Sequence, residues 1–406
     1  MAASNKSAEK ISIPKNMLLP QEEMLEVKKK GKKIKIGIPS DFDKVEYRVP
    51  LTPQAVDLLI SYGHEILIEK DAGKSASYSD KEYRESGATI VDTKEETFQC
   101  DIILRVAPFN CDEIEQLRGN QVIISSLQIQ AHCNESIQKL MQKKVTTIAF
   151  EYLENEDGFL PIVHQMSQIA GVTSITVASE YLSKSRDGKG VLFGEVTGVT
   201  PAELVIIGTS TAAEYAARAA LGLGIFVKVF DTSVYELSKL EEKLGRRIFT
   251  SVFYPKVLRK ALISADVVIG ATSFNTAPKF KVSEDLVKQM KEGSVIIDLN
   301  ASQGGCFETS KPTDFNNPTY VKHGVVHYCV PNSPAMVART ASISFSNILI
   351  PILLAIGENG GVDNYIKSSQ GFRKGVYIYH GILTNPDIGR LFNISAKDID
   401  LLLAVF

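Results

Sequence analysis

Two successive series of strands alternating with helices constrain the fold of this chain most strongly. The first series has apolar runs, separated by stretches of helical periodicity, at residues 34–38, 64–69, 102–106, 122–125 and 145–150. The second series has apolar runs at residues 203–207, 226–231, 267–270 and 295–298. Because such alternation is typical of parallel sheets covered by helices on both faces, we predict an α/β protein with two doubly wound, Rossmann-like domains and a cleft between them.

The segments outside these series suggest how the domains are joined. A lysine-rich segment, residues 28–33, ends a lead segment that we interpret as a solvated arm or an oligomer contact. A long helix over residues 166–184 and a glycine-rich hinge over residues 188–198 separate the two series. After a further apolar run at residues 326–330, the sequence predicts an apolar helix and a last helix at 397–404.

Length and charge limit the class of protein. A chain of 406 residues is too long for one ordinary core, so two domains are expected. The formal net charge is −2 and 23% of the residues are charged, which leaves no excess of either sign to attract nucleic acid or an anionic membrane. A small polar substrate is the more natural partner.

Cysteine usage and hydropathy bear on the compartment. The five cysteines are widely spaced and form no CxxC pair, which argues against both a disulfide framework and a zinc or other metal site. No secretory signal is visible at the N-terminus. The most apolar stretch, residues 343–356, is interrupted by polar residues and a proline and falls short of the ~20 residues of a membrane span, so it predicts a buried helix. We therefore expect a cytoplasmic protein.

A dinucleotide site is expected where the second series begins. The run from residue 203 to 213 reads as a buried strand, a tight turn and the first turn of a helix. Gly208 and Ala213 match the first and third positions of the G-x-G-x-x-G/A fingerprint, but Ser210 occupies the second, where a side chain would crowd the phosphates. Asp231, at the end of the next strand, is placed to accept from a ribose hydroxyl, which favours NAD over NADP.

Several sequence blocks resemble those of the alanine dehydrogenases and the related transhydrogenase subunits. The resemblance runs from about residue 33 to the C-terminus, and its blocks are residues 36–39, 47–53, 166–171, 303–308 and 327–332. It implies a discontinuous substrate domain, residues 34–166 and 335–406, and an NAD-binding domain, residues 167–334, after an N-terminal arm of residues 1–33. It also implies cofactor-binding roles for Ser167 and Asn332.

The same resemblance implies reversible oxidative deamination of L-alanine to pyruvate and ammonia, commonly by hexamers, with an Arg, a Lys, a His and an Asp in the active site. Arg48 stands at the Arg position and can grip a carboxylate. Ala107, Gln128 and Ser302 replace the Lys, the His acid/base and the Asp. Arg105, two residues before Ala107 on an expected strand, would share its face and restore the charge but not the basicity.

Three further residues are of a type that could act in catalysis or binding. His132 is expected to be a solvated loop histidine rather than a cleft residue, whereas for His164 a place near the substrate and a structural role stay equally open. Cys306 follows a Gly-Gly turn and could look like a nucleophile, but the sequence shows no His and Asp partners that would activate it. Two hypotheses remain: an NAD-dependent alanine dehydrogenase-like enzyme with an altered acid/base set, or an impaired paralogue that keeps the fold and works as a nucleotide-binding or regulatory partner subunit.

Overall fold

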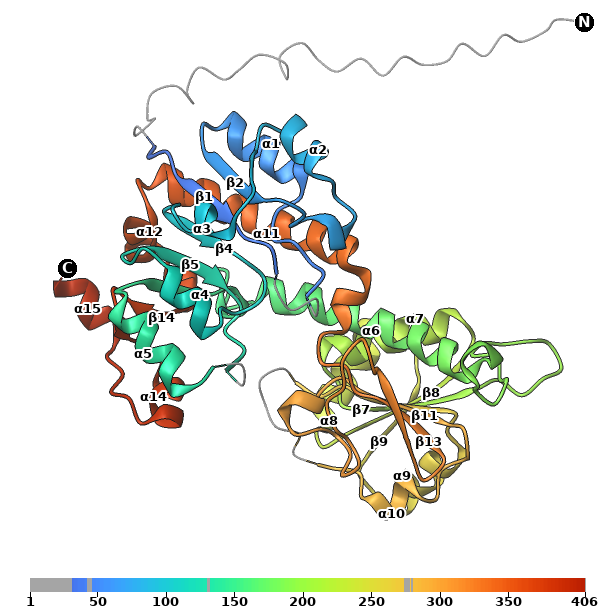
Figure 1. Cartoon of the computed structure of the whole chain (residues 1–406). Helices are drawn as coiled ribbons and strands as arrows, with labels where there is room; N and C mark the ends of the chain where they lie inside the picture. The colour runs from blue at the N-terminus through green and yellow to red at the C-terminus, as the bar shows by residue number, and fades with distance from the viewer. Residues whose placement is uncertain (1–30, 42–45, 130–131, 274–277, 279, 406) are drawn as a thin grey trace, which may run out of the picture.

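The computed structural model describes residues 31–41, 46–129, 132–273, 278 and 280–405, and it contains two α/β bodies (Figure 1). Both ends of the described chain contribute to the first body, while the middle of the chain forms the second. Most of the expected N-terminal arm lies outside the described residues, and residues 31–33 are exposed.

The first sheet has eight strands in the order β15-β14-β6-β5-β4-β1-β2-β3. Its strands are β1 Lys35–Ile38, β2 Glu65–Glu69, β3 Thr89–Val91, β4 Ile102–Leu104, β5 Val122–Ser125, β6 Thr146–Ala149, β14 Val376–Tyr379 and β15 Ile382–Leu383. β1 to β6 pair in parallel, and β14 and β15 pair antiparallel at one edge. Strand order reverses between β1 and β4, and ligands of such sheets bind outside the carboxyl ends of the strands at this point.

Helices cover both faces of the first sheet. They are α1 Pro53–Ser61, α2 Asp80–Glu85, α3 Lys94–Thr97, α4 Cys111–Gln116, α5 Asn134–Gln142, α11 Ala338–Glu358, α12 Val362–Ser368, α13 Gln370–Arg373, α14 Pro386–Phe392 and α15 Ile399–Val405. α1 shows why the sequence is helical here. The Thr52 hydroxyl accepts from the Ala55 N–H at its start, Pro53 occupies the first turn, and Val56 and Leu59 are fully buried.

The apolar helix near the C-terminus is buried, as predicted, but it is longer than residues 343–356. α11 has 21 residues and continues through Pro351. The helical stretch from residue 333 to 358 is long and apolar enough to cross a membrane by length and composition. Phe345, Leu349 and Leu353 nevertheless belong to the core of the first body, so this apolar surface packs against protein.

The second sheet has seven strands in the order β12-β13-β11-β10-β7-β8-β9. They are β7 Glu203–Ile207, β8 Phe226–Asp231, β9 Phe249–Val252, β10 Val267–Gly270, β11 Val295–Asp298, β12 Thr319–Lys322 and β13 Val325–Tyr328. All pairings are parallel except that of β12 with β13. The prediction of two doubly wound, mostly parallel sheets is confirmed, because the four predicted runs of the second series are β7, β8, β10 and β11.

One long helix joins the two bodies. α6, Pro161–Leu182, starts at the first body and packs along α7, Thr211–Gly222, in the second (Figure 1). Gly171 permits this approach, since a Cβ there would lie 2.4 Å from the carbonyl oxygen of Ala212. The other helices of the second body are α8 Val234–Leu244, α9 Pro255–Ser264 and α10 Glu284–Val287. The predicted domain boundaries at residues 166 and 335 fall within α6 and the short helix η8, Ser333–Val337.

Candidate active site and nucleotide crevice

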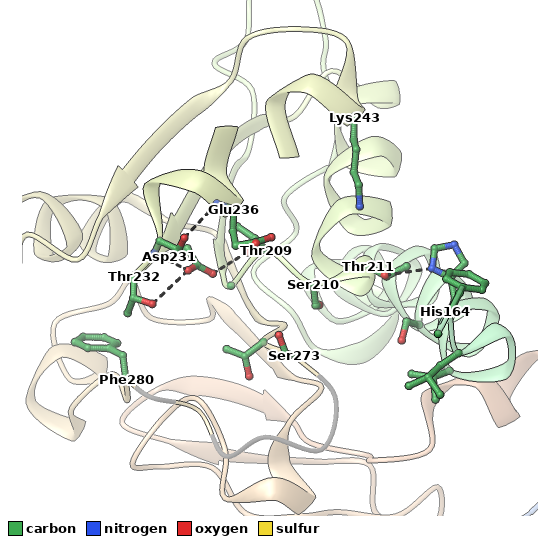
Figure 2. Close-up of a pocket in the computed structure, with 18 of the residues that line it drawn as sticks. His164, Thr209, Ser210, Thr211, Asp231, Thr232, Glu236, Lys243, Ser273 and Phe280 are labelled. Atoms are coloured by element: carbon green, nitrogen blue, oxygen red, sulfur yellow. Dashed lines mark hydrogen bonds between the residues drawn. The ribbon is translucent and has the colours of Figure 1, made fainter. Parts of the chain in front are cut away.

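A cavity of about 560 Å³ opens at the carboxyl ends of β7, β8 and β10. It lies at the point where strand order reverses on either side of β7. Figure 2 shows its walls, in which the N-terminus of α7 faces the first turns of α6. This is the position at which a Rossmann-like sheet holds a dinucleotide.

Gly208 makes the turn from β7 into α7. Its φ is +108°, a backbone conformation that favours glycine, and a Cβ would lie 2.4 Å from the carbonyl oxygen of Ala271. A glycine is therefore required at the first position of the fingerprint. Ser210 and Thr211, at the start of α7, line the cavity, and the free N–H groups of a helix N-terminus can bind an anion.

Ser210, at the second position of the fingerprint, caps α7. Its hydroxyl accepts from the Ala213 N–H at 3.3 Å and donates to the carbonyl oxygen of Ala271 at 2.8 Å. Both hydrogen bonds of the hydroxyl are thus to the protein backbone, while Ser210 lines the cavity, so the predicted crowding of the phosphates by its side chain stays a prediction. Ala213 at the third position is fully buried, as close packing of helix and strand requires.

The far end of the cavity is acidic. Asp231, the last residue of β8, accepts from the Thr209 hydroxyl at 2.8 Å and from the Ser233 N–H at 2.9 Å (Figure 2). Glu236, from α8, lines the same end. Two carboxylates here repel a ribose 2′-phosphate, so the geometry favours NAD over NADP. Glu236 was missed in the sequence because the fingerprint specifies only one acidic residue.

α6 supplies the opposite wall of the cavity with Ser167 and His164. The His164 ring lies 4.8 Å from the Phe159 ring, and its Nδ1 is 3.4 Å from the Thr211 hydroxyl (Figure 2). Burial lowers the pKa of His164. The structure places His164 in the wall of the nucleotide crevice, beside the start of α7.

Arg48 lies next to this crevice. Its Nη1 is 3.4 Å from the sulfur of Met166, the neighbour of Ser167. Its Nε and Nη2 donate to the two carboxylate oxygens of Glu46 at 2.7 and 2.6 Å, and the Asn332 amide donates to the same carboxylate at 2.9 Å. Arg48 and Asn332 therefore meet at Glu46 from the two bodies. Glu46 is not among the residues predicted from the sequence.

The ion pair between Arg48 and Glu46 is buried. Arg48 and Glu46 are each 8% exposed. Burial alone would raise the pKa of Glu46, but the charge and hydrogen bonds of Arg48 and the Asn332 amide outweigh it, so the pKa lies below its usual value. Glu46 thus fixes one edge of the guanidinium, while Nη1 on the other edge donates to the Met166 sulfur, a weak acceptor that a stronger one can replace.

Arg105 does not take the place expected for it. β4 ends at Leu104, so the strand rule that would align Arg105 with Ala107 does not apply. Its guanidinium is buried and donates to Asp41 at 2.5 Å and to Glu113 at 2.6 Å. Arg105 is therefore a structural cation that neutralises two buried carboxylates, and the expectation that it replaces the missing lysine charge at the substrate is wrong.

Gln128 has an unusual backbone. Its φ is +38°, its side chain is exposed, and its amide nitrogen donates to the Ser126 hydroxyl at 3.0 Å. Beneath this turn lies Glu151, whose Oε1 accepts from the Leu127 N–H at 2.7 Å. Its Oε2 is buried with no hydrogen-bond partner among the described residues. Burial raises the pKa of Glu151 to about 7, so this carboxyl can exchange a proton near neutral pH.

The remaining candidate residues are spread over the two bodies. Ala107 is partly buried after β4, whereas Ser302 is exposed in the turn that follows β11. Cys306 is fully buried, and burial raises the pKa of its thiol, so it is inert, as expected. His132 is only 8% exposed and its ring lies 6.5 Å from that of Tyr377, so the expectation of a solvated loop histidine is wrong.

Comparison with known proteins identifies the family. A family model for the N-terminal domain of alanine dehydrogenase/PNT matches residues 37–170, and the model for the C-terminal domain matches residues 174–386. The chain belongs to the alanine dehydrogenase/PNT family. It is 36% identical over 370 residues to alanine dehydrogenase 2 of Staphylococcus aureus (strain USA300), a match that covers 90% of this chain and 99% of the relative.

Solved structures agree with this family and fold. An L-alanine dehydrogenase matches with a TM-score of 0.82 and 32% identity, covering 89% of this chain and 100% of the other. A transhydrogenase from Sinorhizobium meliloti matches with a TM-score of 0.73 and 21% identity, covering 87% and 99%, and shares the fold. The resemblance to this family inferred from the sequence blocks is confirmed.

Proposed function

We propose that this chain is an NAD-dependent oxidoreductase of the alanine dehydrogenase type, which oxidatively deaminates L-alanine or a related small amino acid. The observation that carries this proposal is the place of Arg48, a buried cation beside the nucleotide crevice in a chain of this family. Its Nη1 donates only to the weak acceptor Met166 Sδ, which a substrate carboxylate would replace.

The crevice fits the cofactor that the family implies. Gly208 and the start of α7 would hold the pyrophosphate, Asp231 the adenosine ribose, and Ser167 and Asn332 the nicotinamide half. NAD, when bound, supplies the acceptor for the hydride of the substrate. What the chain itself has to supply is orientation of the amino acid and transfer of its protons.

Glu151 is our candidate for proton transfer, because Ala107, Gln128 and Ser302 cannot accept a proton near neutral pH. In the proposed step the substrate ammonium passes one proton through a water molecule to the Glu151 carboxylate. The amine becomes neutral and the carboxylate becomes a carboxylic acid. The ionisable groups that face Glu151 are Arg48, Tyr152 and Tyr377, so the cation of Arg48 supports the ionised form.

The decisive experiment measures turnover and cofactor binding together. Purified protein is given NAD and a panel of small amino acids at alkaline pH, and NADH formation is followed, while calorimetry measures NAD binding. Turnover of L-alanine or a close relative supports the enzyme. NAD binding without turnover across the panel would instead indicate an impaired paralogue, and absence of both would leave an interaction module on an old enzyme fold.

Gly208→Val is expected to weaken NAD binding at least about tenfold. A side chain at φ +108° costs roughly 1–2 kcal/mol, and the added atoms meet the carbonyl of Ala271 and close the anion site. Calorimetry measures the Kd. Gly222→Ala at the end of α7 is the matched control, since a Cβ there meets nothing within 4 Å, and it should bind as the parent does. Equal Kd values for both variants would contradict the assigned turn.

Glu151→Gln is expected to lower kcat by at least about 100-fold, the usual effect of losing a positioned acid or base. It should also remove the acid limb of the pH–rate profile. The burial-raised pKa of Glu151 places this limb at about pH 7 in the parent, with activity rising as the carboxyl ionises. Glu151→Asp should retain the limb, and Glu156→Gln on the exposed part of the same loop should leave the profile unchanged. A Glu151→Gln profile like that of the parent would rule out this proton acceptor.

We further propose a cytoplasmic homo-oligomer, for which a hexamer is the family expectation. The five cysteines are all free, which agrees with a reducing compartment. The loop after α6 exposes apolar side chains, with Leu192 63% and Val199 64% exposed, and contact with another copy would cover them. Sedimentation at several concentrations tests this assembly, and a monomer at every concentration would exclude it.

A further inference from the structure

Two cysteines lie side by side at the start of two neighbouring helices. Cys111 is the first residue of α4, and Cys133 is the N-cap of α5, which packs against α4 (Figure 1). Their sulfur atoms are 3.9 Å apart, although 22 residues separate them in sequence. Cys133 is exposed and Cys111 is partly exposed. A small reagent in solution can therefore reach this pair.

The surroundings give the two thiols different chemistry. The Cys133 sulfur accepts from the Ser136 N–H at 3.4 Å, and this contact lowers the pKa of Cys133. Desolvation and the neighbouring sulfur raise the pKa of Cys111. Glu135 and Lys139, both on α5, are the charged groups near the pair, and they oppose each other. Cys133 is therefore the nucleophile and Cys111 the resolving thiol.

The other three cysteines differ from this pair in burial. Cys100, Cys306 and Cys329 are fully buried, and burial raises the pKa of each thiol. They act as small apolar side chains in the core. Thiol oxidation of the folded protein should for this reason be confined to the pair on α4 and α5.

We propose that Cys111 and Cys133 form a reversible thiol-oxidation site that reacts with small disulfides of the glutathione type. The Cys133 thiolate attacks one sulfur of the disulfide, forms a mixed disulfide and releases the first small thiol. The Cys111 thiolate, after losing its proton, attacks the Cys133 sulfur and releases the second. The protein is oxidised by two electrons, and the small disulfide is reduced to two thiols.

The bond can form with little movement of the backbone. The sulfur atoms must close from 3.9 Å to about 2.05 Å, and rotation of the exposed Cys133 side chain can provide much of this. The bond would tether the segment after β4, which carries Ala107, to the segment after β5, which carries Gln128. Oxidation would thereby restrict the segment that carries Gln128, under which Glu151 lies.

The test treats the full-length protein with oxidised glutathione, removes the reagent and counts free thiols after denaturation. The parent is expected to lose two of its five thiols, and peptide mapping should place the new bond between Cys111 and Cys133. Cys111→Ser should stop at a glutathione adduct on Cys133, while Cys133→Ser should form no bond. Dithiothreitol should restore all five thiols of the parent.

Three results would overturn the proposal. They are retention of all five thiols in the parent, a stable adduct on Cys133 without the second step, and loss of thiols at Cys100, Cys306 or Cys329. The two serine variants sit at the surface end of their helices, so a circular dichroism spectrum like that of the parent verifies that they fold. Because the thiol count does not depend on turnover, it is informative whatever the substrate is.

Discussion

Arg48→Met is expected to lower kcat/KM for L-alanine at least about 100-fold. The substitution keeps the length of the side chain but removes the cation that is proposed to hold the substrate carboxylate. Truncating one partner of a buried, hydrogen-bonded charge pair costs about 2–5 kcal/mol of binding. Steady-state rates over a range of L-alanine concentrations measure the loss.

The same substitution leaves Glu46 buried without its partner, so stability has to be separated from binding. An unpaired buried charge destabilises a protein by about 3–5 kcal/mol, and Arg48→Met alone is expected to melt at a lower temperature than the parent. The double variant Glu46→Gln with Arg48→Met removes both charges and should regain most of this stability. If the double variant also regains turnover, Arg48 does not bind the substrate.

Arg105→Met is expected to be the most destabilising of the single substitutions considered at pH 7. Arg105 is 3% exposed and neutralises both Asp41 and Glu113, so its loss removes the cation beside Asp41 and leaves Glu113 with Lys94. The expected cost is about 3–5 kcal/mol. Thermal unfolding at pH 7 measures it.

The loss of stability caused by Arg105→Met should become smaller as the pH falls, because the two carboxyl groups then bind protons. In the parent, burial raises the pKa of Asp41 to about 6 despite Arg105. Without Arg105 this pKa rises further above the unfolded value, so the penalty is full at high pH and disappears as protons bind on acidification. The difference in unfolding free energy between variant and parent should therefore be smaller at pH 5 than at pH 7.

A matched control is available at the surface. Arg118 pairs with Asp101 at 3.4 Å, with side chains 48% and 57% exposed, and such pairs contribute about 0–1 kcal/mol. Arg118→Met should therefore unfold close to the parent at both pH values. If Arg105→Met is destabilised relative to the parent by the same amount at pH 5 and pH 7, the buried carboxylates are not the cause of its lower stability.

Some of the site could be predicted because its signals are local. The turn at Gly208, the acid at Asp231 and the arginine at position 48 each stand in a short block of sequence beside a recognisable strand. Glu46 lies only two residues before Arg48, but these residues are outside the strands of the first sheet, so the strand rule does not predict that the two side chains meet. Glu151 gave no such signal, because its importance comes from the turn at Gln128, 23 residues away, under which it is buried.

The sequence by itself determined the architecture, since periodicity and glycine placement are properties of neighbouring residues and identify strands, helices and the nucleotide turn. Only the tertiary structure decided which polar and charged side chains contact one another. Asn332 reaches Glu46 across 286 residues, Arg105 reaches Asp41 across 64, and Cys111 meets Cys133 across 22. Burial and pairing depend on groups brought together only by the fold, and in a low-dielectric interior those contacts fix which side chains are charged, reactive or free to bind.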